Sequence, residues 1–577
     1  MAVKPAHPGG EVVRDRADRN LFGVQARPLA TRVAAARRVS DLASMTTGVA
    51  TMAARVRVEQ GDLVGTHSDG LYRFLGVAYA EAPVGNLRWR PPAPPAKWRG
   101  LRAATGFGAA CPQPGGALGD LRVAERSEDC LFLNVWTRTL QRGAGQPVMV
   151  WIHGGANLAG AGSEDVYDGA RLARRGATVV TFNYRLGAFG FVAHPDFGAN
   201  FAVQDHLAAL RWVARNIAEF GGNPHNVTIF GQSAGAVAVR TLLSSPPARG
   251  LFHRAIMQSG GYEPFAFAPS PNYERATGVS ERLFDLLGSR NPDVLRMAPT
   301  AEVARASLEL SGTTPAPGHV HTPANLTWRP VPDDVVVSGT EFAGWPQDVP
   351  VLLGCVDNEA RHFITPEGTY TRAGFDRMAR VLAGPRAVDV VALLAHSAKN
   401  WYEALDQLIT SAIYLEPALA ALGRFTEIHR PVYYYHFTRV SPGGRRSGEL
   451  AKHSAEIRYV FGNLAPADAY DDTDTAISSA MLNAWFEFAS TGAPRNQDGS
   501  TWAKYDHNDP QCTFIGDTLR SRPIYISPLT EILRSLRVSG NVAVGSTPVL
   551  AAAPDRAIRN PCEHARDRGS DAAAAPK

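Results

Sequence analysis

A serine flanked by two glycines stands in the sequence IFGQSAG, residues 229–235. A serine hydroxyl attacks a carbonyl efficiently only when a neighbouring base takes its proton. The residues NVTIF before it form an apolar run typical of a buried strand, and AGAVAVRTLL after it can form a helix. A G-x-S-x-G pattern at a strand-to-helix turn exposes the serine hydroxyl. We therefore predict that Ser233 is a nucleophile, against the alternative of a spectator serine in a glycine turn.

An acid that orients the base should follow Ser233 in the chain, at the end of a later strand. The apolar run VPVLLGCV (349–356) has the character of such a strand, and the loop DNEARHF comes directly after it. This loop offers two carboxylates, Asp357 and Glu359, and its position alone does not choose between them.

The base should be a histidine in a loop beyond a still later strand. The histidines after Glu359 are residues 362, 396, 429, 436, 453, 507 and 564. His436 lies inside the strand-like run PVYYYHF, where a packed histidine is expected, whereas His453 lies in the polar loop beyond it, just before a helical stretch. We predict that His453 is the base.

The glycine-rich sequence WIHGGAN (151–157) could supply backbone donors for the oxygen that becomes charged during attack on a carbonyl. It follows the apolar run PVMVWI, at the end of another predicted strand. We expect its N–H groups to act together with the N–H of Ala234, the residue after Ser233. The alternative is an ordinary glycine loop.

The elements that would position these residues alternate along the chain. Continuous apolar runs without polar alternation indicate strands covered on both faces, at residues 147–152, 177–182, 226–230, 349–356 and 431–437. Between them, the segment 205–220 has apolar residues at helical spacing, with Asp205 expected in its first turn, where a helix dipole favours negative charge. The alternation predicts an α/β fold with a large, mostly parallel central sheet covered by helices on both faces.

Composition excludes several classes of protein. The chain has 577 residues, of which 45% are hydrophobic and 20% charged, as in ordinary globular proteins. Residues 1–55 hold 9 Lys and Arg against 4 Asp and Glu, and the remainder holds 50 of each, so the net charge of +5 belongs to the N-terminal segment. We expect no nucleic-acid partner. No apolar run reaches the ~18 residues of a membrane span.

The ends of the chain differ from its centre. Residues 1–54 are rich in Ala, Arg and Pro and lack the apolar core of a secretory signal, so we expect a disordered leader, or a start at Met45 or Met52. Residues 538–577 have the composition of a disordered tail, which leaves 55–537 as a single catalytic domain. We expect a cytoplasmic protein, with secretion through a weak twin-arginine signal at residues 37–38 as the alternative.

The sequence resembles the type-B carboxylesterase/cholinesterase family of α/β-hydrolases, and in particular its bacterial para-nitrobenzyl-esterase-like members. The resemblance spans roughly residues 57–535. It is carried by FLGVAYAEAPVGNLRW (74–89), SEDCLFLNVW (127–136), PVMVWIHGGA (147–156), NYRLGAFGF (183–191), ALRWVARNIAEFGGNPHNVTIFGQSAG (209–235) and LFHRAIMQSG (251–260). The family implies an α/β-hydrolase fold and a serine carboxylesterase that needs no cofactor.

The resemblance also implies roles for individual residues. It assigns Ser233 as nucleophile, Glu359 rather than Asp357 as acid, and His453 as base. The oxyanion donors that it implies are Gly155, Ala156 and Ala234.

Three residues depart from the family pattern. Gln232 replaces the Glu that many members have beside the nucleophile, which removes a carboxylate near His453 and bears on the pH dependence. Ala156 replaces a third glycine, and we expect its methyl group to be tolerated if its φ is negative. Asn157 stands where an aromatic residue is common, which favours a more polar acyl side.

The five cysteines form no C-x-x-C pair, so we expect no zinc site or other metal site. The resemblance implies a disulfide between Cys111 and Cys130. The missing export signal favours two reduced thiols instead, and both interpretations stay open here.

We expect a serine esterase acting on small to medium carboxylic esters, including those of bulky alcohols, through an acyl-enzyme. A lipase or a carbamate, amide or lactone hydrolase of the same family is the alternative. A non-catalytic binding or adhesion module is a more distant one, because such modules typically lose a member of the triad that this chain retains.

Overall fold

The structure is a computed structural model of the chain and describes residues 51–538, except 116–121, 124, 263, 267–270, 313–325, 338–346, 365–367, 369 and 428–430. The predicted leader and tail lie almost entirely outside the described residues. Strand β1 spans Met52–Val58, so the boundary expected between residues 54 and 55 falls inside a strand.

Thirteen strands of the described chain form one sheet, in the order β1-β2-β3-β5-β7-β6-β8-β9-β10-β11-β12-β13, with β4 beside β2. Seven neighbouring strands, from β7 to β12 in that order, pair in parallel. The pairs outside this group are antiparallel, except that β4 pairs with β2 in parallel. The strands after β1 are β2 (Gly61–Ser68), β3 (Leu71–Ala78), β4 (Leu101–Ala103), β5 (Phe132–Thr137), β6 (Gln146–Ile152), β7 (Thr178–Phe182), β8 (Gly222–Gln232), β9 (Arg254–Gln258), β10 (Val351–Val356), β11 (Val432–Phe437), β12 (Gln511–Ile515) and β13 (Leu519–Pro523).

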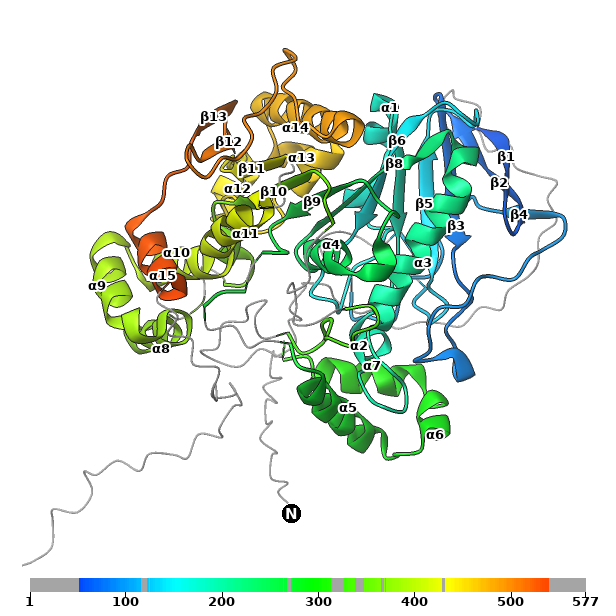
Figure 1. Cartoon of the computed structure of the whole chain (residues 1–577), viewed down its shortest axis with the longest axis horizontal. Coiled ribbons are helices and arrows are strands. Elements are labelled where there is room, and N and C mark those ends of the chain that lie inside the picture. Colours follow the sequence, from blue (N-terminus) through cyan, green and yellow to red (C-terminus); the bar gives the residue numbers. More distant parts are fainter. Residues whose placement is uncertain are drawn as a thin grey trace, which may run out of the picture. The chain divides into compact units, whose positions relative to one another are not determined.

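Helices cover both faces of this sheet (Figure 1), as the apolar runs predicted. They are α1 (Ala170–Arg175), α2 (Gly187–Phe191), α3 (Phe201–Asn216), α4 (Ala234–Ser244), α5 (Tyr273–Leu287), α6 (Pro292–Arg296), α7 (Thr300–Glu309), α8 (Arg372–Ala383), α9 (Ala387–Ser397), α10 (Trp401–Ile409), α11 (Glu416–Thr426), α12 (Pro442–Ser447), α13 (Ile457–Phe461), α14 (Asp472–Thr491) and α15 (Pro528–Val538). A π-helical turn, Thr410–Leu415, joins α10 to α11.

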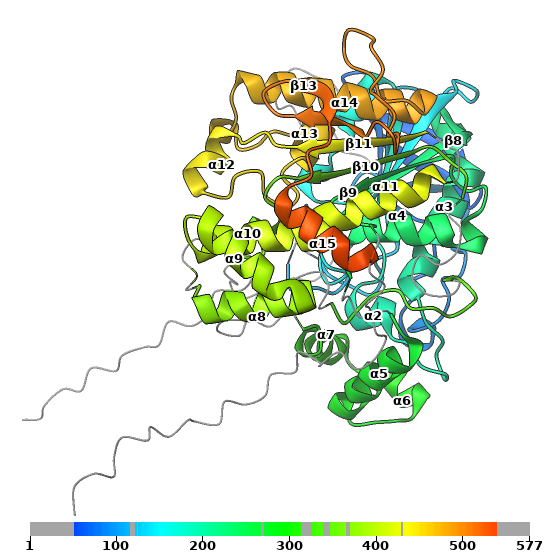
Figure 2. The same ribbon diagram turned by 60° about the vertical axis from the view of Figure 1, so that its left-hand side comes forward.

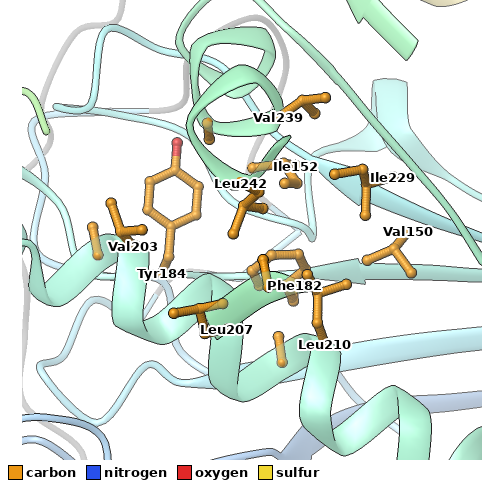
Figure 3. Packing of buried hydrophobic residues seen from close by; sticks show 14 of the residues in the cluster. Val150, Ile152, Phe182, Tyr184, Val203, Leu207, Leu210, Ile229, Val239 and Leu242 are labelled. Carbon is orange, nitrogen blue, oxygen red and sulfur yellow. The ribbon is translucent and has the colours of Figure 1, made fainter. Parts of the chain in front are cut away.

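Strand β6 shows why a continuous apolar run means burial on both faces. Its alternate residues Val148, Val150 and Ile152 pack in one hydrophobic cluster with α3, α4 and α11, and Figure 3 shows part of this cluster. Its other residues, Met149 and Trp151, pack in a second cluster with α1, α13 and α14. Successive side chains of a strand point to opposite faces, so a strand between two helical layers has no polar side. The five predicted strands are all present in the structure.

The helix predicted over 205–220 is observed as α3 and a following 3₁₀ turn, Ile217–Phe220, but it begins at Phe201. Asp205 is therefore not in the first turn, and its expected interaction with the helix dipole is wrong. Its carboxylate is buried and accepts hydrogen bonds from Nε and Nη2 of Arg185, each at 2.8 Å. Asp205 thus fixes α3 against the chain segment that follows β7.

Two features lie outside the predicted pattern. Strands β12 and β13 extend the sheet beyond β11, which was expected to be the last strand. Helices α8, α9, α10 and α15 pack on one another through a third hydrophobic cluster, and Figure 2 shows them grouped to one side of the strands. Within the described ranges, no helix has both the length and the apolar character to cross a membrane.

Candidate active site

Ser233 lies at the junction of β8 and α4, where the chain turns sharply. Its φ of 57° and ψ of −125° are unusual for a residue with a side chain. The N–H of Ser233 donates to the carbonyl of Gln258 on β9 at 2.9 Å, and its carbonyl accepts from the N–H of Val237 in α4 at 3.0 Å. These bonds fix the strained turn, and the side chain of Ser233 stays half-buried among buried neighbours.

The glycines around Ser233 are required by close backbone contacts. A Cβ on Gly231 would lie 2.5 Å from the carbonyl oxygen of Gly235, and one on Gly235 would lie 2.0 Å from that of Ile152. Both distances are shorter than a Cβ atom can tolerate, so α4 can approach β6 only where these side chains are missing. This supports the interpretation of G-x-S-x-G as a built turn.

The structure brings Glu359 and His453 together from distant parts of the chain. Nδ1 of His453 lies 2.5 Å from Oε2 of Glu359, and both side chains are buried. Oε1 of Glu359 accepts the N–H of Val356 at 3.0 Å. A proton on Nδ1 that is donated to a carboxylate leaves Nε2 as an acceptor, which is the arrangement that a general base needs.

Nε2 of His453 faces the residue that precedes Ser233. It lies 3.0 Å from Nε2 of the Gln232 side chain. Among the described residues, no hydrogen bond joins the Ser233 hydroxyl to His453. The structure therefore brings His453 to the turn at Ser233, while the side-chain amide of Gln232 occupies its free nitrogen.

Burial governs the charge state of the histidine and the carboxylates. Burial lowers the pKa of His453 and raises the pKa of Glu359, because desolvation disfavours the charged form of each group, and the hydrogen bond from the Val356 N–H opposes the shift of Glu359. Because desolvation disfavours an imidazolium, His453 is neutral in the free enzyme. A neutral His453 is ready to accept a proton.

Three rings surround that of His453. The centroids of His362, Phe363 and Tyr414 lie 5.7, 5.3 and 5.4 Å from its own. Tyr414 comes from the π-helical turn between α10 and α11, and such turns are frequent at functional sites. These rings exclude water from the histidine, and no pattern in the sequence indicated the contribution from Tyr414.

A buried carboxylate behind the site also escaped sequence analysis. Glu456, three residues after His453, accepts a hydrogen bond from Nε2 of Gln258 at 3.1 Å, and Oε1 of Gln258 accepts one from Nε1 of Trp485 at 3.0 Å. Burial and the charge of Glu359 raise the pKa of Glu456 to about 8. Because Gln258 also binds Ser233 through its carbonyl, this chain of bonds supports the serine turn from behind.

The glycine-rich turn after β6 has an unusual backbone. Gly155, Ala156 and Asn157 have φ values of 106°, 58° and 60°. The condition set for tolerating the Ala156 methyl group, a negative φ, is therefore not met. The left-handed conformation is held by hydrogen bonds from the N–H groups of Leu158 and Ala159 to the carbonyl of Gly155, and from the Asn157 side chain to the carbonyl of Trp328 at 2.9 Å.

The N–H groups of Gly155, Ala156 and Ala234 donate to no other group in the described part of the chain. The turn lies against the serine, because a Cβ on Gly154 would come within 3.2 Å of Cβ of Ser233. Three unpaired donors beside a serine hydroxyl form an environment that could receive a negatively charged oxygen.

Two further expectations from the sequence concern Asp357, the other carboxylate of the predicted acid loop, and the pair Cys111 and Cys130. The side chain of Asp357 is half exposed, and its Oδ1 lies 3.4 Å from Nε2 of His436 on β11. Cys111 and Cys130, on which the family resemblance and the missing export signal disagreed, are joined by a disulfide with Cα atoms 5.1 Å apart. Within the described residues, no group of three or more His, Cys, Asp or Glu could hold a metal ion.

Residues 52–525 match the sequence profile of the carboxylesterase family. The chain belongs to the carboxylesterase family. It is 34% identical over 487 residues to the para-nitrobenzyl esterase of Bacillus subtilis (strain 168), a match that covers 80% of this chain and 94% of the relative. It is 33% identical over 504 residues to the fumonisin B1 esterase of Sphingopyxis macrogoltabida, covering 82% and 88%.

The same family appears among solved structures. A PNB esterase structure superimposes with a TM-score of 0.72 and 30% sequence identity, over 83% of this chain and 99% of that chain. This carboxylesterase is accordingly an α/β-hydrolase and a carboxylic ester hydrolase, as the sequence predicted.

Proposed function

We propose that this carboxylesterase hydrolyses carboxylic esters through an acyl-enzyme formed on Ser233, with His453 as base and Glu359 as the acid that orients it. The contact between Nδ1 of His453 and Glu359, at the turn that exposes Ser233, carries the proposal. A base needs an orienting partner on one nitrogen and access to the nucleophile on the other.

The acylation step follows from this placement. The proton of the Ser233 hydroxyl passes to Nε2 of His453 while Oγ bonds to the carbonyl carbon of the ester. The oxygen that becomes negative is received by the N–H groups of Gly155, Ala156 and Ala234. The imidazolium then gives its proton to the departing alcohol oxygen, and the C–O bond breaks.

Deacylation repeats these steps with water. Water gives a proton to Nε2 of His453 and its oxygen attacks the acyl carbon, after which the proton returns to Oγ of Ser233 and the acid leaves. The buried carboxylate of Glu359 stabilises the transient imidazolium in both halves of the reaction. No step requires a metal ion or an organic cofactor.

We further propose that the substrates are small to medium esters, including those of bulky alcohols. Gly155 and Ala156 have positive φ values, and their N–H groups donate to no group in the described part of the chain, so two consecutive donors are available to a substrate oxygen. Next to them, the side-chain N–H of Asn157 donates a hydrogen bond to the backbone carbonyl of Trp328. Two relatives are named as a para-nitrobenzyl esterase and a fumonisin B1 esterase, which supports ester hydrolysis as the reaction of this chain.

Rapid mixing with p-nitrophenyl acetate tests the mechanism. We expect an initial burst of p-nitrophenol stoichiometric with enzyme, together with an acetyl group on Ser233 in the quenched protein. Ser233→Ala should abolish the burst and lower kcat by about 10⁴ or more, since a triad acts as a unit. Ser447→Ala, at an exposed serine, is the matched control and should behave like the unmodified enzyme. A folded Ser233→Ala protein within tenfold of full activity would remove this serine from the mechanism.

A further inference from the structure

We propose that Gln232 is a positioning residue that holds His453 in its neutral form and thereby extends ester hydrolysis to acidic pH. This inference rests on the proposed function, in which His453 is the base. It concerns a different question, namely which group sets the protonation of Nε2 before the substrate arrives.

The contact on Nδ1 of His453 determines which group donates in the hydrogen bond between Gln232 and Nε2. Glu359 holds the proton on Nδ1 of His453, so Nε2 carries a lone pair in the neutral ring. Nε2 of the Gln232 amide lies 3.0 Å away, and of the two ends of the amide only this N–H end can donate to a lone pair. Gln232 therefore donates to the nitrogen that must later receive the serine proton.

The amide of Gln232 is fixed by its surroundings. Gln232 is 1% exposed and is the last residue of β8, where it pairs with Gln258 of β9. On the other side it packs on the glycine-rich turn, because a Cβ on Gly154 would lie 3.2 Å from Oε1 of Gln232. The contact with His453 is thus part of a packed core and not that of a mobile surface side chain.

The other ionisable groups near His453 do not bind Nε2. Glu359 binds Nδ1, and the rings of His362 and Tyr414 approach the face of the imidazole at more than 5 Å. Glu456 is buried and binds Gln258, and Lys452 pairs with Glu449 at 2.7 Å. Residue 232 is therefore the described group that contacts Nε2 directly.

An amide and a carboxylate at residue 232 shift the pKa of His453 in opposite directions. An amide N–H is attracted by the lone pair of a neutral ring and repelled by the Nε2–H of an imidazolium, so Gln232 adds to the effect of burial and lowers the pKa of the base. A carboxylate would attract the imidazolium and raise that pKa. The free base that starts catalysis consequently persists to lower pH with Gln than with Glu.

The same contact has a consequence for acylation. Oγ of Ser233 must reach Nε2 to lose its proton, and the amide of Gln232 occupies that nitrogen in the free enzyme. During acylation the serine hydroxyl takes the place of the amide, and the proton passes from Oγ to Nε2. The amide is uncharged and holds Nε2 through a single hydrogen bond, so the serine hydroxyl can replace it, whereas a carboxylate would bind the imidazolium more firmly.

Profiles of kcat/KM against pH, measured from pH 3 to 9 with p-nitrophenyl acetate in brief assays started from enzyme kept at neutral pH, test the inference. The acidic limb reports the protonation of the base in the free enzyme. We expect its apparent pKa to rise by about half a unit to one unit in Gln232→Met, which removes one hydrogen bond of ordinary strength. We expect a larger rise in Gln232→Glu, which adds an attractive charge.

Matched controls and a direct measurement complete the test. Gln141→Met and Gln141→Glu, at an exposed residue before the start of β6, the opposite end of that strand from the glycine-rich turn, should leave the limb unmoved. The proton resonance of the His453 Nδ1–H should titrate with the same order, lowest in the unmodified enzyme and highest in Gln232→Glu. An unmoved limb in folded Gln232 variants that still show the burst would overturn the role of Gln232 and leave the mechanism intact. A missing burst in the unmodified enzyme would instead reject the mechanism itself.

Discussion

Asp357 and Glu359 stand two residues apart in one loop, yet they have different surroundings. Glu359 begins a 3₁₀ turn, Glu359–His362, that folds it under His453 and buries it completely. Asp357 precedes that turn, is half exposed and lies near His436. Burial gives the Glu359 carboxylate an undisturbed contact with one partner, which is what an orienting acid requires.

This difference leads to a prediction about the two carboxylates. Glu359→Gln keeps the shape of the side chain but can present an N–H to Nδ1 and so disturb the ring tautomer, and we expect kcat to fall by about 10³–10⁴. Asp357→Asn is the matched control and should change kcat less than twofold. Steady-state hydrolysis of p-nitrophenyl acetate by both folded variants decides between them, and a larger loss at residue 357 would reverse the assignment.

Residue types and order were enough to predict which side chains meet, but not how they meet. The contact of Glu359 with His453 was expected from chain order and family resemblance. The contact of Gln232 with Nε2 and the left-handed φ of Ala156 were not, because both arise from packing of segments far apart in sequence. Asp205 was misinterpreted for the same reason, since its partner Arg185 lies outside the helix.

At the scale of elements, the predicted strands are those with the simplest environment. Strands β6, β7, β10 and β11 are apolar along most of their length, and β8 is apolar and buried in its second half, because helices cover both faces. Edge strand β13, with the sequence LRSRP, is largely exposed and has no apolar pattern to detect. A sheet edge leaves little trace in sequence because water can satisfy its backbone and side chains.

The oxyanion turn is an element whose backbone, rather than its side chains, is proposed to act. We expect measurable hydrolysis of tert-butyl acetate, slower than that of a primary acetate, because donors on a left-handed turn leave room beside the carbonyl. Gly155→Val should lower kcat on all esters by about 10²–10³, since valine cannot adopt the φ of 106° without strain and one donor would be misaligned.

Product analysis with active-site-titrated enzyme checks both expectations. Gly143→Val is the matched control, because Gly143 also has a positive φ of 87° but lies in a turn with open space around it. It should cost stability without a selective loss of kcat. Primary esters that are cleaved while tertiary ones stay intact would contradict the first expectation, and near-normal turnover by Gly155→Val would contradict the second.

At the scale of the whole molecule, several histidines are enclosed in the core as neutral rings. Burial lowers the pKa of His153 to about 4 and that of His206 to about 3, with a small further effect of His153 on His206. Both ring nitrogens of His206 are buried without a hydrogen-bond partner in the described chain, and its ring packs edge-on against Tyr184 at 4.5 Å. An imidazolium there would lack any compensating partner.

These histidines should make the fold sensitive to acid. The unfolded chain binds a proton at each of them near the ordinary pKa of about 6.5, whereas the folded chain does not until about pH 3–4. Stability is therefore fully present above pH 6.5 and falls as the pH drops below it. Each such histidine contributes a slope of about 1.4 kcal/mol per pH unit in that window, and the slope fades below the folded pKa.

His206→Phe isolates one of these contributions. Phenylalanine keeps an aromatic ring against Tyr184 but cannot bind a proton, so the free energy of unfolding should fall less steeply between pH 6.5 and 5. The expected difference from the unmodified enzyme is about 2 kcal/mol at pH 5 relative to pH 7. Urea unfolding at pH 7, 6 and 5 measures it, and His507→Phe, at an exposed histidine, is the control that should leave the slope unchanged. Equal slopes for His206→Phe and the unmodified enzyme would mean that His206 binds its proton in the folded protein, and the buried ring would then need a partner that stabilises its charge.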